Sequence, residues 1–581
     1  LHASPSSRVL PKIAEMDMDT ATTTARPEKV HSSKWRYWAD KLAVTSEPGL
    51  TSAQLMLTNY DLKPVEPERR QWGPWNFVAF WVADSFNVNT WMISSSMIVN
   101  GLSWWQSWLC VWIGYAIAGG FICLTGRIGA QYHIGFPVVN RSSFGIWGSL
   151  WPVFNRAAMA CIWYGVQAYI GGHCVYLMIR SIWKSWDRYE IPNTFPEGSG
   201  TRTADWVSFF IFWLCSLPAI WFPVHKIRHL FTVKSYVVPC AGIAFLIWAI
   251  VRAGGVGPIV RQPAKAQGSE LAWEFVKGVM SAIANFATLI VNDPDFSRFA
   301  AKPRDALWSQ LFTIPIGFAF TSFIGIMVSS SSTVIYGEEI WDPLDLLEKF
   351  IDDGGSAQRF GVFVIAASFA LAQLGTNIAA NSVSAGTDMT ALLPRWISIR
   401  RGGYICAAVG LAMCPYTLLT SSNQFTTYLS SYSVFLSSIA GVMCSDYYLV
   451  RKGYLEVKEL YDARKTGPYY FTYGFHWRGY AAYIAGILIN VVGFAGAIGR
   501  DVPVGATYIY NLNFFAGFIV SSGVYWGLCK VSPIPACSDR WMEVGDEIDD
   551  IRVGYNAGSQ DFDEEAVTGS SKGIDDGVKH I

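Results

Sequence analysis

Long apolar runs separated by short polar loops fill the chain between residues 71 and 531. Because a helix needs roughly 20 mainly apolar residues to cross a bilayer, this pattern predicts twelve membrane spans. The expected spans are 73–100, 104–125, 149–179, 206–223, 231–253, 271–296, 307–335, 358–386, 403–420, 425–450, 478–498 and 510–531. The expected fold is therefore an all-α polytopic membrane protein.

The first span is unlike a simple membrane anchor, because polar residues interrupt its middle. These residues are Asp84, Ser85, Asn87, Asn89 and Thr90. Polar groups at mid-depth are costly unless they face a cavity or a partner, and short Asp, Asn and Ser side chains compete with helical hydrogen bonds. We therefore expect a discontinuous helix, which membrane proteins tolerate where the backbone lines a site.

The sixth span has a second interruption. Asn285 breaks its apolar middle, and the sequence Asn292-Asp293-Pro294-Asp295 follows at its end. Two irregular spans five positions apart are typical of transporters built from two inverted repeats of five helices, with the ligand held between the repeats at the midplane. The pattern thus predicts a five-plus-five fold followed by two extra helices.

Aromatic and amide side chains recur on the inner spans. Trp163 and Gln167 are four residues apart and share one helix face, as do Asn377 and Asn381. Alone, each is more often core packing or a link between helices. Together with Asn285 they favour a flat, uncharged ring with N–H and C=O groups, although Asp84 leaves a cationic ligand open. Arg156 is expected to reach the membrane interface.

Composition narrows the function further. The 44 basic and 44 acidic residues balance, so nothing indicates a nucleic-acid partner. The 11 Cys residues include no CxxC spacing, which argues against a metal site or a disulfide framework. No nucleophile–base arrangement suggests an enzyme. A channel is disfavoured because no charged ring or filter-like repeat occurs.

Residues 1–70 are polar and are expected to form a disordered cytoplasmic tail, and residues 532–581 an acidic cytoplasmic tail. The loops richest in Lys and Arg lie on the side of both tails, which predicts that both termini are cytoplasmic. Lys572 and Lys579 could be targets of a ubiquitin ligase or simply solvated, and the sequence favours neither.

Several long motifs resemble the nucleobase–cation-symport-1 family, in its fungal uracil, allantoin and uridine permease branch. They include PERRQWGPWNFVAFW, DSFNVNTWMI, GRIGAQYHIGFPVVNRSSFG, WPVFNRAAMACIWYGVQA, NDPDFSRFA and AQLGTNIAANSVSAGTDMTALLPRWISIRRG. The resemblance covers roughly residues 60–530. It implies the five-plus-five fold of sodium-coupled amino-acid transporters and cation-coupled uptake across the plasma membrane by alternating access.

The resemblance also assigns roles to residues of the site. The span 3 residues that stack on and bond the substrate match Trp163 and Gln167, and the span 8 amide matches Asn381, supported by Asn377. The second stacking ring matches Phe286, and the gating positions of span 10 resemble Tyr432 and Leu429. Trp163, Gln167, Asn377 and Asn381 lie within the quoted motifs.

The cation site departs from the pattern of the sodium-coupled bacterial members. Their span 1 carbonyl positions resemble Ser85 and Val88, whereas their two span 8 hydroxyls become Gly375 and Thr376 here, so one hydroxyl is missing. The resemblance therefore implies H⁺ rather than Na⁺ as the coupling ion, with no other cofactor. Asp84 and Lys277 are the candidate proton carriers, since titratable groups within spans are functional suspects.

These observations favour a proton-coupled importer of a nucleobase-type ring, with uracil ahead of allantoin, uridine and urate. A nutrient sensor that binds such a ring without transporting it is the alternative from another class. The main substrate, the proton carrier, the oligomeric state and the role of the tails stay open.

Overall fold

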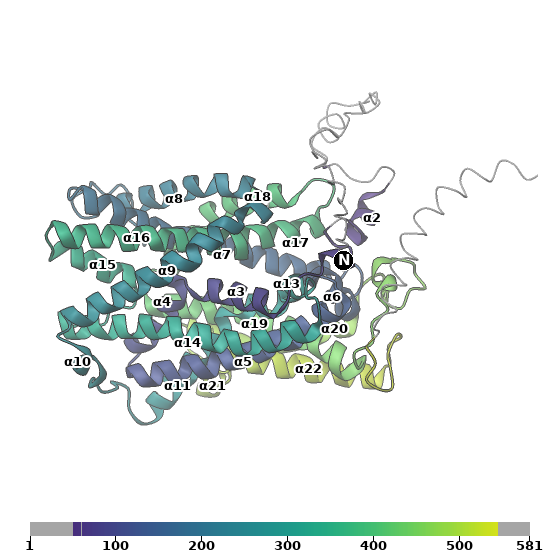
Figure 1. Cartoon of the computed structure of the whole chain (residues 1–581). Helices are drawn as coiled ribbons and strands as arrows, with labels where there is room; N and C mark the ends of the chain where they lie inside the picture. The colour runs from purple at the N-terminus through teal and green to yellow at the C-terminus, as the bar shows by residue number, and fades with distance from the viewer. Residues whose placement is uncertain (1–43, 45–49, 60, 223, 544–581) are drawn as a thin grey trace, which may run out of the picture. The chain divides into compact units, whose positions relative to one another are not determined.

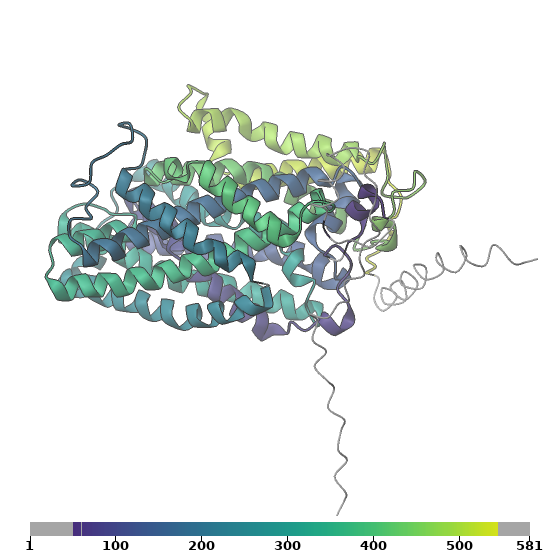
Figure 2. The same ribbon diagram turned by 90° about the horizontal axis from the view of Figure 1, so that it is seen from above.

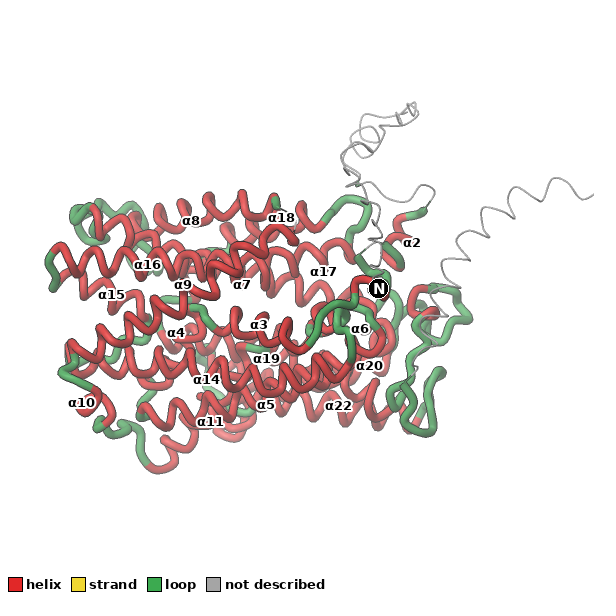
Figure 3. The backbone as a smooth tube through the Cα atoms, viewed as in Figure 1, coloured by secondary structure: helices red, strands yellow, loops and turns green. Residues whose placement is uncertain are grey.

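The computed structural model describes residues 44, 50–59, 61–222 and 224–543. Helices account for nearly all of the regular structure in these residues, and no strand occurs among them (Figure 3). Most helices run along one direction and form a bundle with two ends (Figure 1). We call them the α15 end, where α10 and α15 lie, and the α2 end, where α2 and α6 lie.

The helices follow one another along the chain with few long connections. Their bounds are α2 Ser52–Leu57, α3 Pro74–Ser85, α4 Val88–Val99, α5 Trp104–Tyr132, α6 Phe136–Phe144, α7 Leu150–Ile182, α8 Thr203–Trp221, α9 Val224–Arg252, α10 Val256–Val260, α11 Gly268–Asn285, α12 Ala287–Asn292, α13 Pro294–Ser297, α14 Pro303–Tyr336, α15 Pro343–Asp352, α16 Ser356–Thr376, α17 Ser384–Leu392, α18 Ile399–Ala412, α19 Ser422–Cys444, α20 Trp477–Ala497, α21 Val504–Tyr510 and α22 Asn513–Val531. Two π-helical segments, η2 Asn377–Val383 and η4 Ser445–Val450, extend α16 and α19, and short 3₁₀ turns are η1 Pro67–Arg69, η3 Pro415–Leu418 and η5 Lys458–Tyr461.

Each of the twelve expected spans corresponds to helical structure. In the described part of the chain, eight helices are long and apolar enough to cross a membrane: α5, α8, most of α9, α14, α16 with its extension, α19 with its extension, α20 and α22. The remaining four spans do not meet this criterion because of their breaks, their composition or their length. The first and sixth are broken, α7 carries several charged and amide residues, and α18 has only 14 residues.

The first span breaks where the polar residues predict, between α3 and α4. Asn87 has an extended backbone and accepts a hydrogen bond from Thr90 N at 2.8 Å, so it caps the new helix. Its Nδ2 also donates to Asp84 O at 2.7 Å, which holds the end of α3 against the start of α4. The Asn side chain therefore satisfies backbone groups on both sides of the break.

The sixth span breaks after Asn285, where Phe286 joins α11 to α12 with a φ of −91° and a ψ of −3°. The two breaks meet, because Asn89 Nδ2 donates to Asn285 Oδ1 at 3.1 Å. A second hydrogen bond runs from Asn285 Nδ2 to Tyr115 Oη of α5 at 3.3 Å. Hydrogen bonds of side-chain amides thus connect the two interrupted helices at the level where both lose their regular backbone hydrogen bonds.

Close packing of small residues sets the position of α7. A Cβ on Gly165 would lie 2.5 Å from Gly410 O of α18, and one on Gly172 would lie 2.4 Å from Phe209 Cα of α8. Small residues at such crossings let helix backbones approach, which is the main source of packing energy between membrane helices. Figure 2 shows the same bundle from above. This packing holds the face of α7 that carries Trp163 and Gln167.

Ordered structure extends into both stretches expected to be tails. Residues 52–57 form α2, and Arg141 of α6 donates to the carbonyls of Met56 and Leu57 at 2.9 Å each. At the other terminus, Glu543 accepts a bidentate pair from Arg127 at 2.7 and 2.8 Å. The expectation of disorder up to residue 70 is wrong for α2, since these buried contacts order it. The expected ubiquitination targets Lys572 and Lys579 lie outside the described residues.

Candidate functional site

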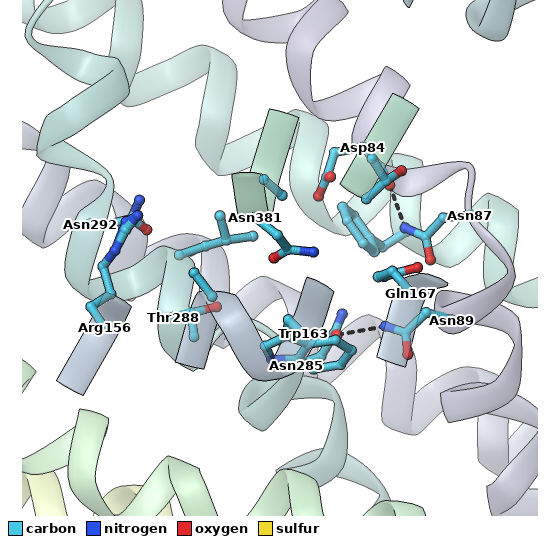
Figure 4. Close-up of a pocket in the computed structure, with 15 residues that line it drawn as sticks. Asp84, Asn87, Asn89, Arg156, Trp163, Gln167, Asn285, Thr288, Asn292 and Asn381 are labelled. Atoms are coloured by element: carbon cyan, nitrogen blue, oxygen red, sulfur yellow. Dashed lines mark hydrogen bonds between the residues drawn. The ribbon is translucent and has the colours of Figure 1, made fainter. Parts of the chain in front are cut away.

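A central pocket lies where the two broken helices meet α7, α14 and α16 (Figure 4). It is lined by Asp84, Asn87, Asn89, Arg156, Ala160, Trp163, Gln167, Asn285, Thr288, Leu289, Asn292, Phe318, Thr376, Ala380 and Asn381. Most of the side chains with hydrogen-bonding groups in this set are amides. The structure therefore brings together residues that lie up to about 300 positions apart in the sequence.

Two of the lining amides offer an unused acceptor. Gln167 is 4% exposed and its Oε1 has no hydrogen-bond partner among the described residues, and the same holds for Asn89 Oδ1. Buried polar atoms are normally paired, so each unpaired one needs an explanation. Two free carbonyl-type acceptors beside the ring of Trp163 form a site that can accept hydrogen bonds from N–H groups of a bound ring.

Asn381 lies on the π-helical segment that follows α16. Its Nδ2 donates to Asn377 Oδ1 at 3.0 Å, and Asn377 Nδ2 donates to Tyr164 O of α7 at 3.1 Å. The structure places Asn381 in the pocket lining and Asn377 behind it, as a link to α7. The widened turn of π-helix, which frequently occurs at functional sites, sets the direction of both amides.

Phe286 is placed differently from the sequence expectation, because it is not among the residues that line the pocket. Its ring is fully buried, stacks on Trp81 with centroids 5.6 Å apart, and packs edge-on against Phe318 at 4.8 Å. Phe318, on α14, is the aromatic residue that lines the pocket besides Trp163. Sequence reasoning missed Phe318, since nothing in the pattern of α14 separates it from other apolar residues.

Tyr432 and Leu429 of α19 are both buried. Tyr432 Oη donates to Ala284 O at 2.8 Å, so it bonds to the helix just before the second break. The rings of Tyr428 and Tyr432 lie 5.8 and 6.1 Å from that of Trp163. Trp163 is therefore covered by α19, whereas the pocket lining continues along α7 to Arg156.

Arg156 is not at the membrane interface, and the expectation that it reaches water is wrong. It is 2% exposed and donates from Nε to Asp388 Oδ2 of α17 at 2.8 Å, with Asp295 at 3.9 Å. The physical reason is the buried carboxylate of Asp388, helped by the partly buried Asp295, which holds the guanidinium inside the bundle. Arg156 thus closes the pocket on the side away from Tyr432.

The residues expected at a cation site lie close to the ammonium group of a lysine, Lys234. Lys234 of α9 is 2% exposed, and its Nζ donates to Thr376 Oγ1 at 2.6 Å. Asp84 interacts electrostatically with the same ammonium group. Ser85 and Val88 are buried next to the first break, and Ser85 Oγ donates to Val82 O at 2.8 Å.

Lys277 lies elsewhere. Its Nζ pairs with Glu274 at 2.7 Å, and it lines a separate cavity between α11, α19, α20 and α21. Sequence reasoning missed Lys234, although one signal was present: it is a lysine inside the apolar run 231–253. The lining of the central pocket includes neither His nor Cys.

Comparison with known proteins shows that the chain is similar to permeases. The family model "Permease for cytosine/purines, uracil, thiamine, allantoin" matches residues 64–517. An uncharacterized permease of Schizosaccharomyces pombe is 54% identical over 88% of this chain and 86% of its own length. In Saccharomyces cerevisiae, the uracil permease is 43% identical over 94% of this chain and 89% of its own, and the allantoin permease 47% over 82% and 76%.

The fold is that of a solved transporter. The structure of Mhp1 in an inward-facing conformation superposes with a TM-score of 0.66 at 22% identity, over 86% of this chain and 98% of that one. This likeness shows the fold of that transporter, in agreement with the expected five-plus-five arrangement. A chain with this fold, a matching family model and relatives of such identity is a multi-pass membrane transporter and not an enzyme. The chain belongs to the family of permeases for cytosine and purines, uracil, thiamine and allantoin.

Proposed function

We propose that this protein imports a nucleobase-type ring together with a proton, that uracil is its main substrate, and that it works by alternating access. The carrying observation is the central pocket, in which the Trp163 ring lies beside the unpartnered acceptors Gln167 Oε1 and Asn89 Oδ1. Allantoin, uridine and urate are the alternative substrates, since they share N–H and C=O groups with uracil.

The chemistry of the pocket favours a neutral ring. Aromatic faces at Trp163 and Phe318 suit stacking, and a site that bonds N–H or C=O groups rejects analogues lacking them, because its own polar groups are then left unpaired. The charged lining residues have opposite charges near them in the protein: Arg156 donates to Asp388, and Asp84 interacts electrostatically with Lys234. The pocket therefore offers no spare charge to a charged substrate.

Proton coupling is supported by the contact between Lys234 and Thr376. An ammonium group 2.6 Å from this hydroxyl lies where a bound sodium ion would need oxygen ligands, and Gly375 supplies no second hydroxyl. In our proposal, Lys234 and Asp84 together carry one exchangeable proton. With that proton they form an ammonium–carboxylate pair, and without it the amine of Lys234 is neutral. Protonation and substrate binding then favour the same state, which is what coupling requires.

The distribution of charge along the bundle supports a plasma-membrane orientation with the α2 end in the cytoplasm. Basic residues follow the helices that finish at the α2 end, among them Arg298, Lys302 and Arg304 after α13. The loop before α15 is acidic and contains Glu338 and Glu339. Positive residues favour the cytoplasmic side, so both termini would be cytoplasmic and the α15 end would face the outside.

Uptake of labelled uracil in yeast lacking its own permeases tests this function. Unlabelled uridine, allantoin and urate serve as competitors, and the assay is repeated with a protonophore and with sodium replaced. We expect saturable uptake that collapses with the protonophore and ignores sodium. Uptake that survives the protonophore but requires sodium would overturn the coupling proposal.

Two variants link that uptake to the pocket. Gln167→Ala removes the unpartnered acceptor and should abolish or greatly weaken uptake while the protein stays at the cell surface. Gln71→Ala is the matched control, because Gln71 is exposed and its side chain donates to a backbone carbonyl, Glu68 O, outside the pocket lining. Normal transport by Gln167→Ala would contradict the site. Substrate-dependent signalling by surface protein that never accumulates uracil would favour the sensor instead.

A further inference from the structure

A cluster of ionisable residues lies at the α15 end, away from the central pocket. It joins the last turns of α7, the loop that follows, the first turn of α8, and α15. Its members are His173, Tyr176, Arg180, Asp187, Arg188, Asp205, Asp342, Asp345, Glu348 and Asp352. Six of these are carboxylates, whereas only two are arginines, so the cluster carries an excess of negative charge.

The arginines hold the cluster together through Glu348. Arg180 Nη1 bonds to Glu348 Oε1 at 2.7 Å, and Arg188 Nη2 bonds to Glu348 Oε2 at 2.8 Å. Tyr176 Oη also donates to Glu348 Oε1 at 2.8 Å. His173, Asp345 and Glu348 lie close enough together to hold a metal ion. However, both oxygens of Glu348 are already bonded to guanidinium groups, so a metal ion would have to displace them.

His173 lies at the centre of the remaining negative charge. Its Nδ1 is 3.5 Å from Asp342 Oδ2, and its Nε2 is 3.1 Å from Arg188 Nη2 and 3.7 Å from Asp345 Oδ1. A guanidinium can only donate hydrogen bonds. In this arrangement Nε2 therefore accepts from Arg188, which leaves the ring neutral with its proton on Nδ1, facing Asp342.

Asp342 and Asp345 are the two carboxylates of this cluster that have no close guanidinium in the described structure, and both lie near His173. The side chain of Asp345 is partly exposed, and desolvation by the surrounding protein together with the charge of Asp342 raises its pKa to about 7, against the lowering effects of a protonated His173 and of Arg188. Glu348 adds to the rise, and Tyr169 and Asp205 face the same space from α7 and α8. Asp345 lies on α15, which is outside the membrane-spanning helices.

We propose that His173 and Asp345 form a second proton-binding site, separate from the proposed coupling site at Lys234. One added proton lies between His173 Nε2 and Asp345 Oδ1, and replaces a 3.7 Å contact between two acceptors with a hydrogen bond. Arg188 then keeps its bonds to Glu348 and its contact with Asp205. The bound proton ties α15 directly to α7.

The position of this site gives it a regulatory role. Helix α7 carries Trp163 and Gln167 of the central pocket, whereas Trp341, just before α15, packs on Phe425 of α19 with centroids 5.6 Å apart. Helix α19 in turn carries Tyr432, which covers Trp163. Protonation therefore holds together three elements on the covered side of the pocket and favours the state in which that side is closed. The regulatory role of this site rests on the proposed transport function. The binding of a proton by His173 and Asp345 does not depend on that function.

The sign of the pH effect follows from linkage. The pKa of Asp345 is about 7 in the folded protein, compared with about 3.9 for an unfolded Asp. Between these values the folded state binds more protons than the unfolded state, so stability rises as pH falls. The stabilising contribution should therefore appear as pH drops below about 7 and be complete near pH 4.

Thermal unfolding of the purified full-length protein in detergent at pH 8, 7, 6 and 5 tests the site without any transport assay. We expect the wild-type Tm to rise towards pH 5. Asp345→Asn keeps the shape of the side chain but cannot take up this proton, and should lose most of that rise, as should His173→Gln. Asp501→Asn, outside the cluster, is the matched control and should keep it.

Two results separate this site from the coupling site. In a Lys234→Met background, adding Asp345→Asn should remove the same part of the rise in Tm as it does in the wild type, even where concentrative uptake is lost, so failure of the transport proposal would not remove the signal. If Asp345→Asn and His173→Gln both kept the wild-type pH dependence, the second proton-binding site would be overturned. A rise in Tm caused by ZnCl₂ at pH 8 and abolished by Asp345→Asn would likewise overturn it, in favour of a metal site.

Discussion

Lys234 Nζ donates a hydrogen bond to Thr376 Oγ1 at 2.6 Å, and so joins α9 to the pocket end of α16. Thr376 lines the central pocket, and Lys234 also interacts with Asp84 on α3. The titratable ammonium group of Lys234 thus lies between α3, which carries Asp84, and α16, which carries Thr376. Ionisable groups at membrane depth are rare and are functional by default, so this contact is the first to test.

Lys234→Met keeps the length of the side chain but removes the charge and the proton. We expect it to abolish accumulation of substrate against a gradient, while exchange of internal for external substrate, which needs no net proton movement, continues. Uptake and counterflow in the same vesicles measure the two activities. Lys277→Met is the matched control, since Lys277 pairs with Glu274 away from this site. Accumulation by Lys234→Met at the wild-type level would exclude Lys234 as a proton carrier.

Asn381→Ala and Asn377→Ala should have different effects. Asn381 lines the pocket, so its loss should raise the KM for substrate about 5- to 150-fold, because a lost hydrogen bond that leaves a buried partner unpaired costs about 1–3 kcal/mol. Asn377 instead bonds to Tyr164 O, so its loss should lower the Tm first. Equal effects of both variants on KM, with no change in Tm, would show that this division of roles is incorrect.

Tyr432→Phe removes the hydrogen bond to Ala284 O while keeping the ring against Trp163. Such a bond contributes about 0.5–1.5 kcal/mol, so the state with α19 moved away should become about twofold to tenfold more populated. Labelling of a cysteine introduced at Asn285 from the α15 side measures this change. Tyr480 of α20 donates a comparable bond to Gly148 O, and Tyr480→Phe should leave labelling unchanged. No increase for Tyr432→Phe would show that this bond does not hold the gate.

Arg156→Ala leaves Asp388 buried without its cation. Removing one partner of a buried ion pair costs about 3–5 kcal/mol, so we expect a clearly lowered Tm and less protein at the cell surface. The double variant Arg156→Met/Asp388→Leu removes both charges and should recover much of that loss. Arg464→Ala breaks an exposed pair with Glu459 and should cost about 0–1 kcal/mol. A double variant as unstable as Arg156→Ala would mean that the loss comes from packing and not from the unpaired charge.

Hydropathy and local composition were sufficient for the fold. The apolar runs located all twelve helical spans, because a bilayer demands a minimum apolar length whatever the partners of a helix are. The polar interruption at Asn87 also located the first break, since its side chain bonds to backbone groups within three residues on either side. Hydrogen bonds between a side chain and nearby backbone groups depend only on neighbouring residues, so they can be predicted without knowing how the helices pack.

The sequence also indicated most of the pocket lining. Trp163, Gln167, Asn285 and Asn381 are polar or aromatic side chains at helical spacing within apolar spans, and all four line the pocket. Their place in the pocket lining is expected because a polar side chain inside the membrane costs free energy unless it faces a cavity or a polar partner. Their roles in binding stay predictions until the variants are measured.

Only the tertiary structure decided which helices meet at the pocket. It turned Phe286 towards Trp81 and brought in Phe318, buried Arg156 beside Asp388, and placed Lys234 against Thr376 while Lys277 went to a separate cavity. These outcomes depend on the rotation of each helix about its axis and on contacts between residues about 140–230 positions apart. Sequence spacing reports which residues share a helix face, but only packing against neighbouring helices determines what that face meets.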